Sequence, residues 1–174
     1  MIRRVMLVSA VAGSMALIVP QTAQAQSVFA MAGGVFPTSE SGDIFDTGWM
    51  VAGGITFPLG PGGFWLGVEG SYGQIDTALD GVGVNPIGAM AILGFDLPVP
   101  GSISPYVFGG VGLLAVDEFD LDPTDSDSKF GYQLGGGLNL GSGILSPFVE
   151  VRYEASDEID FFAAMLGLSI GIGK

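Results

Sequence analysis

The side chains that most often carry out catalysis are scarce in this sequence. Its 174 residues include no histidine and no cysteine, which removes the commonest general base, the commonest transition-metal ligand and any disulfide. The segment Gly167–Gly171 matches the G-x-S-x-G pattern of serine hydrolases. That pattern requires a strand-to-helix turn and a histidine partner, whereas here it lies within an apolar segment that reads as a strand. We therefore predict no catalytic residues, no bound cofactor and no enzymatic activity.

A run of acidic residues between positions 117 and 127 is the second candidate, because carboxylates bind calcium. The EF-hand pattern fails there: counted from Asp120, Thr124 stands at position five and Asp125 occupies position six, where a glycine is required. We predict a solvated anionic loop without a specific metal site, and weak binding of divalent cations is the alternative. The acidic residues of this loop are Asp117, Glu118, Asp120, Asp122, Asp125 and Asp127.

Four polar residues stand within otherwise apolar segments and form the third candidate. They are Glu69, Gln133, Glu150 and Arg152. A charge that is removed from water must be paired, so these side chains are tolerable in apolar surroundings only if the fold brings them together. Whether these four side chains meet depends on the secondary-structure elements that carry them.

The N-terminal segment has the layout of a secretory signal. Two arginines precede an apolar run, Val5–Val19, and Ala23-Gln24-Ala25 offers small residues at the positions that a signal peptidase reads. We predict a cleaved signal peptide over residues 1–25 and a mature domain over residues 26–174. A single membrane anchor is the alternative, and both place the chain outside the cytoplasm.

The mature part combines strong acidity with high hydropathy. It contains eighteen acidic residues against only Lys129, Arg152 and Lys174, a balance that repels nucleic acid phosphates and argues against nucleic acid binding. The mean hydropathy is nevertheless +0.56. Uncharged stretches such as Thr47–Val68 are long enough for membrane helices, but proline and paired glycines interrupt them, which an α-helix tolerates poorly. Apolar surface without helices points to strands.

Turn signals divide the mature chain into eight candidate strands. Most are about 9–11 residues long, the length that a tilted strand needs to cross the hydrocarbon layer, and an even number allows up-and-down closure. The candidate strands are Val28–Phe36, Gly48–Phe57, Phe64–Gly73, Ile87–Leu97, Tyr106–Val116, Phe130–Leu140, Phe148–Glu154 and Phe162–Ile172.

The connections between these strands alternate in character. Residues 58–63, 98–104 and 141–146 form short, uncharged connections, and the other four are longer and acidic. Fifteen of the eighteen acidic residues fall in those four, including Glu154. An up-and-down barrel places every second connection at the same end, so the pattern predicts a neutral periplasmic rim and an acidic external one.

Residues within the strands alternate between apolar and polar. In Phe148–Glu154, Val149, Val151 and Tyr153 share one face, while the opposite face carries Glu150, Arg152 and Glu154. Such polar faces are too sparse and glycine-rich for a water-exposed surface, so we predict that they fill a narrow lumen and that the apolar faces contact lipid. There Glu69, Gln133, Glu150 and Arg152 form a salt-bridge network, with a gated pore or proton path as the alternative. Tyr106–Val116 is apolar on both faces, which leaves its register open.

Aromatic residues cluster at the ends of the candidate strands. Two interfacial belts are expected at these positions in a membrane barrel. The residues are Phe36, Trp49, Phe57, Phe64, Tyr72, Phe95, Tyr106, Phe130, Tyr153 and Phe162.

Four segments of the C-terminal half mix glycine with aromatic and aliphatic residues: Pro105–Gly112, Phe130–Leu138, Pro147–Tyr153 and Gly167–Gly173. They resemble the small outer-membrane β-barrel family that includes the OmpX, OmpA-barrel and opacity-type proteins. The resemblance implies an all-β fold, an eight-stranded antiparallel up-and-down transmembrane β-barrel. It also implies a role in envelope integrity, adhesion or surface defence.

We therefore expect an outer-membrane barrel with a structural or surface-interaction role through four acidic external loops. A small passive channel for ions or apolar solutes is one alternative, and a soluble periplasmic lipocalin-like carrier is another. Expected partners are outer-membrane lipid and lipopolysaccharide, whose phosphates divalent cations would bridge to the acidic loops. An extracellular protein partner is not identified, and we expect a monomer.

Overall fold

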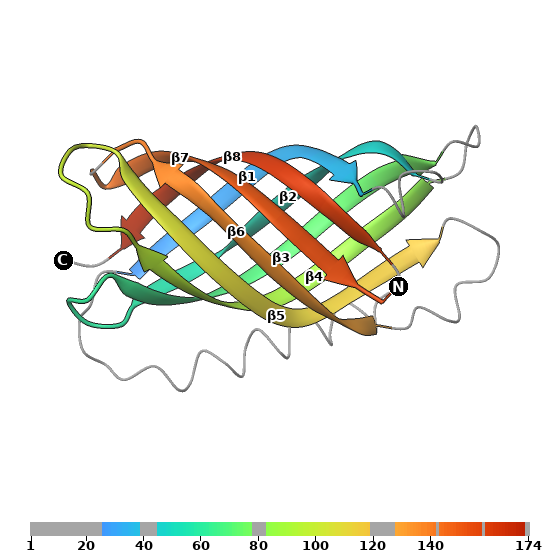
Figure 1. Ribbon diagram of the computed structural model, residues 1–174, viewed down its shortest axis with the longest axis horizontal. Coiled ribbons are helices and arrows are strands. Elements are labelled where there is room, and N and C mark those ends of the chain that lie inside the picture. The colour runs from blue at the N-terminus through green and yellow to red at the C-terminus, as the bar shows by residue number, and fades with distance from the viewer. Residues whose placement is uncertain are drawn as a thin grey trace.

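A computed structural model describes residues 26–38, 45–77, 83–118, 128–141, 143–157 and 159–172. These residues form eight antiparallel strands (Figure 1). Among them no helix is long and apolar enough to span a membrane. The strands are β1 (Gln26–Pro37), β2 (Phe45–Pro58), β3 (Phe64–Thr77), β4 (Gly83–Asp96), β5 (Ser104–Glu118), β6 (Ser128–Asn139), β7 (Leu145–Ser156) and β8 (Asp160–Ile172).

The sheet closes on itself. Each strand pairs with the next along the chain, and β8 returns to pair with β1 from Gln26↔Ile172 to Pro37↔Phe161. Closure leaves no strand edge unpaired, which is the condition for crossing hydrocarbon with strands because lipid offers no hydrogen bonds. The prediction of an eight-stranded up-and-down barrel is confirmed.

One end of the barrel, here called the neutral end, carries the connections 59–63, 97–103 and 140–144, together with the start of β1 and the end of β8. The opposite end carries the acidic segments and is called the acidic end. At the neutral end the first connection turns through Gly60 and Gly63, whose φ angles of 80° and 79° suit glycine. The Asp96 N–H donates to the Gly63 carbonyl over 2.9 Å, which fixes the end of β4 against this turn.

The strands extend further toward the acidic end than the sequence predicts. β3 continues to Thr77, and β4 begins at Gly83, four residues before the expected start at Ile87. β5 reaches Glu118, where the backbones of Asp117 and Glu118 pair with β4. Polar strand residues are tolerated where the barrel leaves the hydrocarbon layer. Each strand can therefore continue for as long as the adjacent strand pairs with its backbone.

This extension corrects the predicted acidic loop. Asp117 and Glu118 belong to the end of β5 rather than to the loop. Asp120, Asp122, Asp125 and Asp127 lie outside the described residues, as does the predicted signal peptide over residues 1–25. The first described strand begins at Gln26, and the boundary between the signal peptide and the mature domain stays a prediction.

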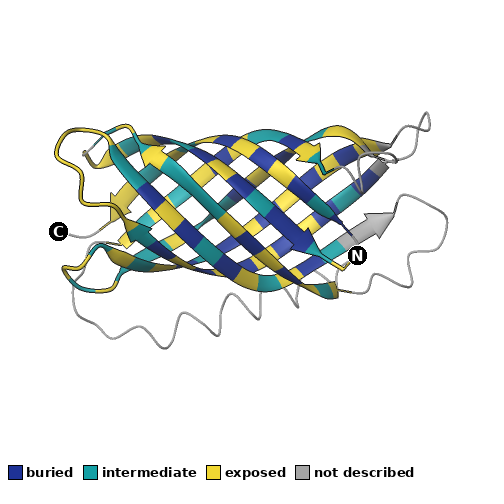
Figure 2. Cartoon of the chain, viewed as in Figure 1, coloured by how far each residue is buried: buried dark blue, intermediate teal, exposed yellow. Residues whose placement is uncertain are grey.

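The two faces of the sheet differ as expected for a membrane barrel. Large apolar side chains point outward, with Leu134 and Leu166 exposed by 59% and 69%, whereas the inward-facing Arg152 is exposed by 1%. Exposed and buried residues alternate along each strand in Figure 2. The sequence left the register of β5 open. In the structure Phe108 and Leu114 of this strand face the lumen, and Val111 faces outward.

Aromatic contacts mark both ends of the outer surface. The Phe64 and Phe95 rings lie 4.7 Å apart near the neutral end, and the Tyr153 and Phe162 rings lie 5.2 Å apart toward the acidic end. Tyr106 was expected in the belt but points into the lumen, where it is 6% exposed. Its position near a strand end did not reveal which face it occupies.

Candidate functional site

The centre of the lumen is occupied by Arg152. Strand β7 directs Glu150 and Arg152 inward at alternate positions. The residues directly opposite Arg152 on the neighbouring strands are Gly135 on β6 and Ala163 on β8. These small neighbours leave the guanidinium free to extend across the barrel.

Arg152 binds two carboxylates at once. Its Nη2 donates to Glu69 Oε2 over 2.9 Å, and its Nη1 contacts Glu69 Oε1 in a second, shorter ion pair. The Nε donates to Glu150 Oε1 over 2.9 Å, and Nη2 lies 2.6 Å from the same oxygen. Nη1 also donates to Gln133 Oε1 over 3.0 Å. The structure thus brings together all four residues that the sequence proposed for an interior polar network.

Three further residues complete the network. The Tyr106 hydroxyl donates to Glu150 Oε2 over 2.7 Å. The Phe108 ring centroid lies 5.7 Å from Arg152 Cζ, within cation–π range, and Met31 Sδ lies 3.3 Å from Nη2. Sequence analysis missed these residues because they stand in apolar segments. Assigning the register of β5 was the step needed to find Tyr106 and Phe108.

The sequence predicts Glu154 both as the last residue of the strand Phe148–Glu154 and as part of an acidic external connection. It lies in β7 with its side chain inside the barrel and 0% exposed, so the strand assignment is right and the connection assignment is wrong. Neither of its carboxylate oxygens has a hydrogen-bond partner in the described part of the chain, and the same holds for Gln133 Nε2. Gln133 and Glu154 are direct cross-strand partners. Glu154 follows the inward alternation of Glu150 and Arg152, and the strand continues beyond it to Ser156.

Between this network and the acidic end the lumen is filled by apolar side chains. Val35, Met50, Ile75 and Phe161 are each 0% exposed, and Leu114 is 1% exposed. They come from five different strands, so they close the barrel from all sides. We call this group the apolar plug.

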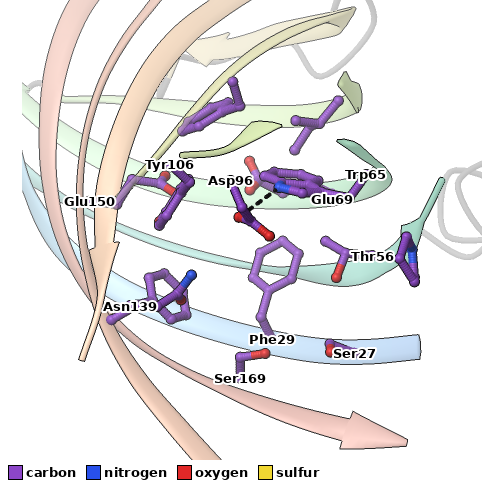
Figure 3. Close-up of a pocket in the computed structure, with 14 residues that line it drawn as sticks. Ser27, Phe29, Thr56, Trp65, Glu69, Asp96, Tyr106, Asn139, Glu150 and Ser169 are labelled. Atoms are coloured by element: carbon purple, nitrogen blue, oxygen red, sulfur yellow. Dashed lines mark hydrogen bonds between the residues drawn. The ribbon is translucent and has the colours of Figure 1, made fainter. Parts of the chain in front are cut away.

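On the neutral-end side of the network the lumen is open. A cavity of about 230 Å³ lies there, bounded by Glu69, Glu150 and Tyr106 and reaching Asp96 near the rim (Figure 3). The Trp65 Nε1–H donates to Asp96 Oδ1 over 3.3 Å. Asp96 therefore faces the cavity beside Trp65.

The comparisons with known proteins decide the family. The model of the outer membrane protein β-barrel domain matches residues 9–169. The chain belongs to this family. No curated protein matches the sequence. Membership of this family places the chain in the outer membrane and excludes the soluble periplasmic carrier.

Solved structures support the same fold. Neisserial surface protein A is 13% identical with a TM-score of 0.67, and the match covers 83% of this chain and 96% of that chain. The N-terminal β-barrel domain of Pseudomonas aeruginosa OprF is 20% identical with a TM-score of 0.54, covering 86% and 100%. The outer membrane enzyme PagL is 17% identical with a TM-score of 0.50, covering 84% and 99%. At these identities the likeness concerns the fold alone, and the fold carries both enzymes and other proteins.

Proposed function

We propose that this protein is a non-conducting outer-membrane barrel whose acidic end is a contact surface. The observation that carries the proposal is the occlusion of the lumen by the Arg152 network and the apolar plug. The Arg152 and Glu69 side chains are exposed by only 0% and 1%. An ion on a path through the barrel would have to separate these buried pairs and then pass an apolar layer, and both steps carry a large desolvation cost.

The acidic end supports the second part of the proposal. Asp46, Asp76, Asp157 and Asp160 lie in the described strands and connections there. In the sequence, further acidic residues fall in the segments between the strands that end there. Such a concentration of negative charge attracts cationic groups and accumulates divalent cations. Lipopolysaccharide, reached through bridging cations, and cationic patches on extracellular proteins are the partners that this chemistry favours.

The proposal extends to a monomer without enzymatic activity. With no histidine in the sequence, proton transfer would have to depend on carboxylates. Two of the three buried glutamates in the described strands, Glu69 and Glu150, are already bound to Arg152, and the third, Glu154, is fully buried and does not line the open cavity. A role as a rigid support for surface contacts uses these residues as they stand.

Planar-bilayer recording tests the occlusion. The protein as it exists should give no steady unitary current. Arg152→Ala combined with Met50→Ala and Phe161→Ala removes the cation of the network and two side chains of the apolar plug, and this variant should give measurable leakage if it inserts. Leu134→Ala is the matched control, because it removes an apolar side chain of the outer face and leaves the lumen unchanged. Steady currents from the unmodified protein would refute the proposal and favour the passive channel.

Calcium titration tests the acidic surface. We expect calcium to raise the melting temperature and to increase binding to vesicles that contain lipopolysaccharide. Combined replacement of Asp120, Asp122, Asp125 and Asp127 by Asn should reduce both effects. If calcium leaves the melting temperature and vesicle binding of the unmodified protein unchanged, the cation-bridged contact is wrong.

A further inference from the structure

We propose that the neutral-end cavity is a binding site for a small alkylammonium cation. The proposal is independent of the acidic surface, because the cavity lies on the other side of the Arg152 network. It depends on three features of the cavity: its aromatic wall, its excess of negative charge and its access from the neutral end.

Aromatic rings form the wall. The residues are Phe29, Trp65, Tyr106, Phe108 and Phe148, from four different strands. The Trp65 ring centroid lies 6.3 Å from that of Tyr106, and the rings of Phe29 and Phe148 are also 6.3 Å apart. Aromatic faces carry negative electrostatic potential, and a cage of them is the usual receptor for a quaternary ammonium group.

Glycines hold these rings against the barrel wall. Each of the five aromatic residues has a glycine as its direct cross-strand partner. A Cβ at Gly94 would lie 2.0 Å from Trp65 Cζ2, and a Cβ at Gly167 would lie 2.2 Å from Phe148 Cζ. Each ring therefore occupies the space that a side chain at its partner glycine would need. Because the five rings lie against the wall in this way, they leave the lumen open instead of filling it. The five pairs are Phe29 with Gly54, Trp65 with Gly94, Tyr106 with Gly137, Phe108 with Gly135, and Phe148 with Gly167.

The charges of the cavity favour a cation. Glu69 and Glu150 line its inner part, and Asp96 lines it toward the rim. Arg152 binds both glutamates but is not among the residues that line the cavity. Three carboxylates thus face one guanidinium that lies behind two of them. A cation that enters from the neutral end meets negative groups first.

The size and layout of the cavity favour an organic cation over a metal ion. At roughly 30 Å³ for each water-sized group, a volume of about 230 Å³ holds a molecule with about seven non-hydrogen atoms. Among the described residues no three acidic side chains converge as metal ligands. Metal ions need such converging oxygens, whereas an alkylammonium group is satisfied by dispersed charge and aromatic faces.

The cavity opens toward the neutral end. Ser27, Asp96, Asn139 and Ser169 line both this cavity and the wider depression inside the rim formed by the 59–63 and 97–103 connections. Figure 3 shows Ser27, Asp96, Asn139 and Ser169 among the residues that surround the cavity. A solute therefore reaches the aromatic wall without passing the Arg152 network.

Trp65 supplies the readout. The chain contains two tryptophans, Trp49 and Trp65, and only Trp65 lines the cavity. In a Trp49→Phe background, choline should change the Trp65 emission saturably. The uncharged isostere 3,3-dimethylbutan-1-ol should bind about tenfold more weakly. The barrel should be kept in a maltoside detergent, because a phosphocholine detergent carries the same headgroup as the probe.

Two variants locate the site. Asp96→Asn should weaken choline binding about threefold to fivefold, the usual range for a solvent-accessible charge pair, and Phe148→Leu should weaken it by removing one ring. Asp76→Asn, at the acidic end, is the matched control and should have no effect. Circular dichroism and altered mobility of unheated samples in gels verify folding; if Phe148→Leu does not fold, Asp96→Asn still decides.

Three results would overturn the proposal. No saturable change on choline addition means that the cavity does not bind this class of ligand. Equal affinity for choline and its neutral isostere means that the cavity is an apolar pocket without cation recognition. An equal loss of affinity in Asp96→Asn and Asp76→Asn means that choline responds to the overall charge of the barrel and not to this site.

Discussion

The two halves of the lumen, on either side of the Arg152 network, are packed differently. On the acidic side, side chains such as Met50, Ile75 and Phe161 meet at the centre and are completely buried. On the neutral side, rings such as Trp65 and Phe148 lie over glycines at the wall and leave a cavity. Both halves are rich in apolar atoms, so hydrophobicity does not distinguish them. Glycines lie opposite Met50, Ile75 and Leu114 in the filled half as well, so glycine alone does not distinguish them either. The difference is that, among the described residues, only in the open half do aromatic rings lie over their partner glycines.

The boundary between the halves is the Arg152 network. Its residues are bound to one another, which lets the lumen change from filled to open within a few residues of β7. An aromatic residue therefore fills a narrow barrel or lines its wall according to the residue that pairs with it on the neighbouring strand. That partner is determined by register, and composition does not reveal it.

Removal of the boundary should have the largest effect. Arg152→Ala leaves Glu69 and Glu150 buried without their cation, which should cost about 3 to 5 kcal/mol of unfolding free energy. Urea unfolding in lipid vesicles, followed by intrinsic fluorescence, measures it. The triple variant Arg152→Met, Glu69→Gln, Glu150→Gln is the control, because it removes all three charges together and should recover most of the loss. If the triple variant is as unstable as Arg152→Ala, lost packing is responsible rather than unpaired charge.

The outer face should contact lipid along both halves of the barrel, and a charge placed on this face tests that contact. Leu134→Lys puts a cation in contact with lipid near the middle of β6 and should cost about 2 to 4 kcal/mol. Gln74→Lys, also outward-facing but beyond the belt residue Tyr72 toward the acidic end, should cost about 0 to 1 kcal/mol. Unfolding free energies in vesicles give both values. A small cost for Leu134→Lys would mean that this face is wet and that the assigned register is wrong.

A methyl group added at Gly167 should move an aromatic ring into the open half of the lumen and partly fill it. Gly167→Ala pushes the Phe148 ring away from the wall and should cost about 1 to 3 kcal/mol. Gly70→Ala is the matched control, since the nearest atom to its added methyl group is 3.9 Å away. Choline affinity in the Trp49→Phe background provides a second measurement, and it should fall in Gly167→Ala only. If both variants are equally stable, Phe148 moves without cost and the glycine is not what keeps it at the wall.

The smallest expected effect is a gain in the filled half. Glu154 has no hydrogen-bond partner there, and Glu154→Leu should therefore raise the unfolding free energy by about 1 to 2 kcal/mol. Asp157→Asn, exposed beyond the end of β7, should change it by about 0.5 kcal/mol or less. Urea unfolding of the two variants side by side measures the difference. A loss of stability in Glu154→Leu would show that the carboxylate is stabilised by a partner inside the membrane-embedded barrel.

The sequence was sufficient for the architecture but not for the lumen. Alternation along β3, β6, β7 and β8 identified the inward face, and with it Glu69, Gln133, Glu150 and Arg152. Charge alone is a poor sign of a loop. It places Asp117 and Glu118 in a connection and counts Glu154 there as well as in its strand, although all three lie in strands.

The open and filled halves were not predictable without register. Trp65 and Gly94 are 29 positions apart in the sequence, and only their pairing on β3 and β4 places one over the other. β5 shows the same limit, because both of its faces are apolar and nothing in its own segment separates Tyr106 from Val107. Local patterns show which residues share a face, whereas the cavity depends on which residues meet across strands.

The pairing of β1 with β8 has a consequence for how the molecule forms. Every other ladder joins consecutive strands, but this one joins Gln26 to Ile172. The final seam therefore waits until the whole polypeptide has been delivered, and it carries the greatest chain-entropy cost of any pairing. Until that moment the edges of β1 and β8 lack partners, so we expect the meeting of the first and last strands to be the slowest step of barrel formation.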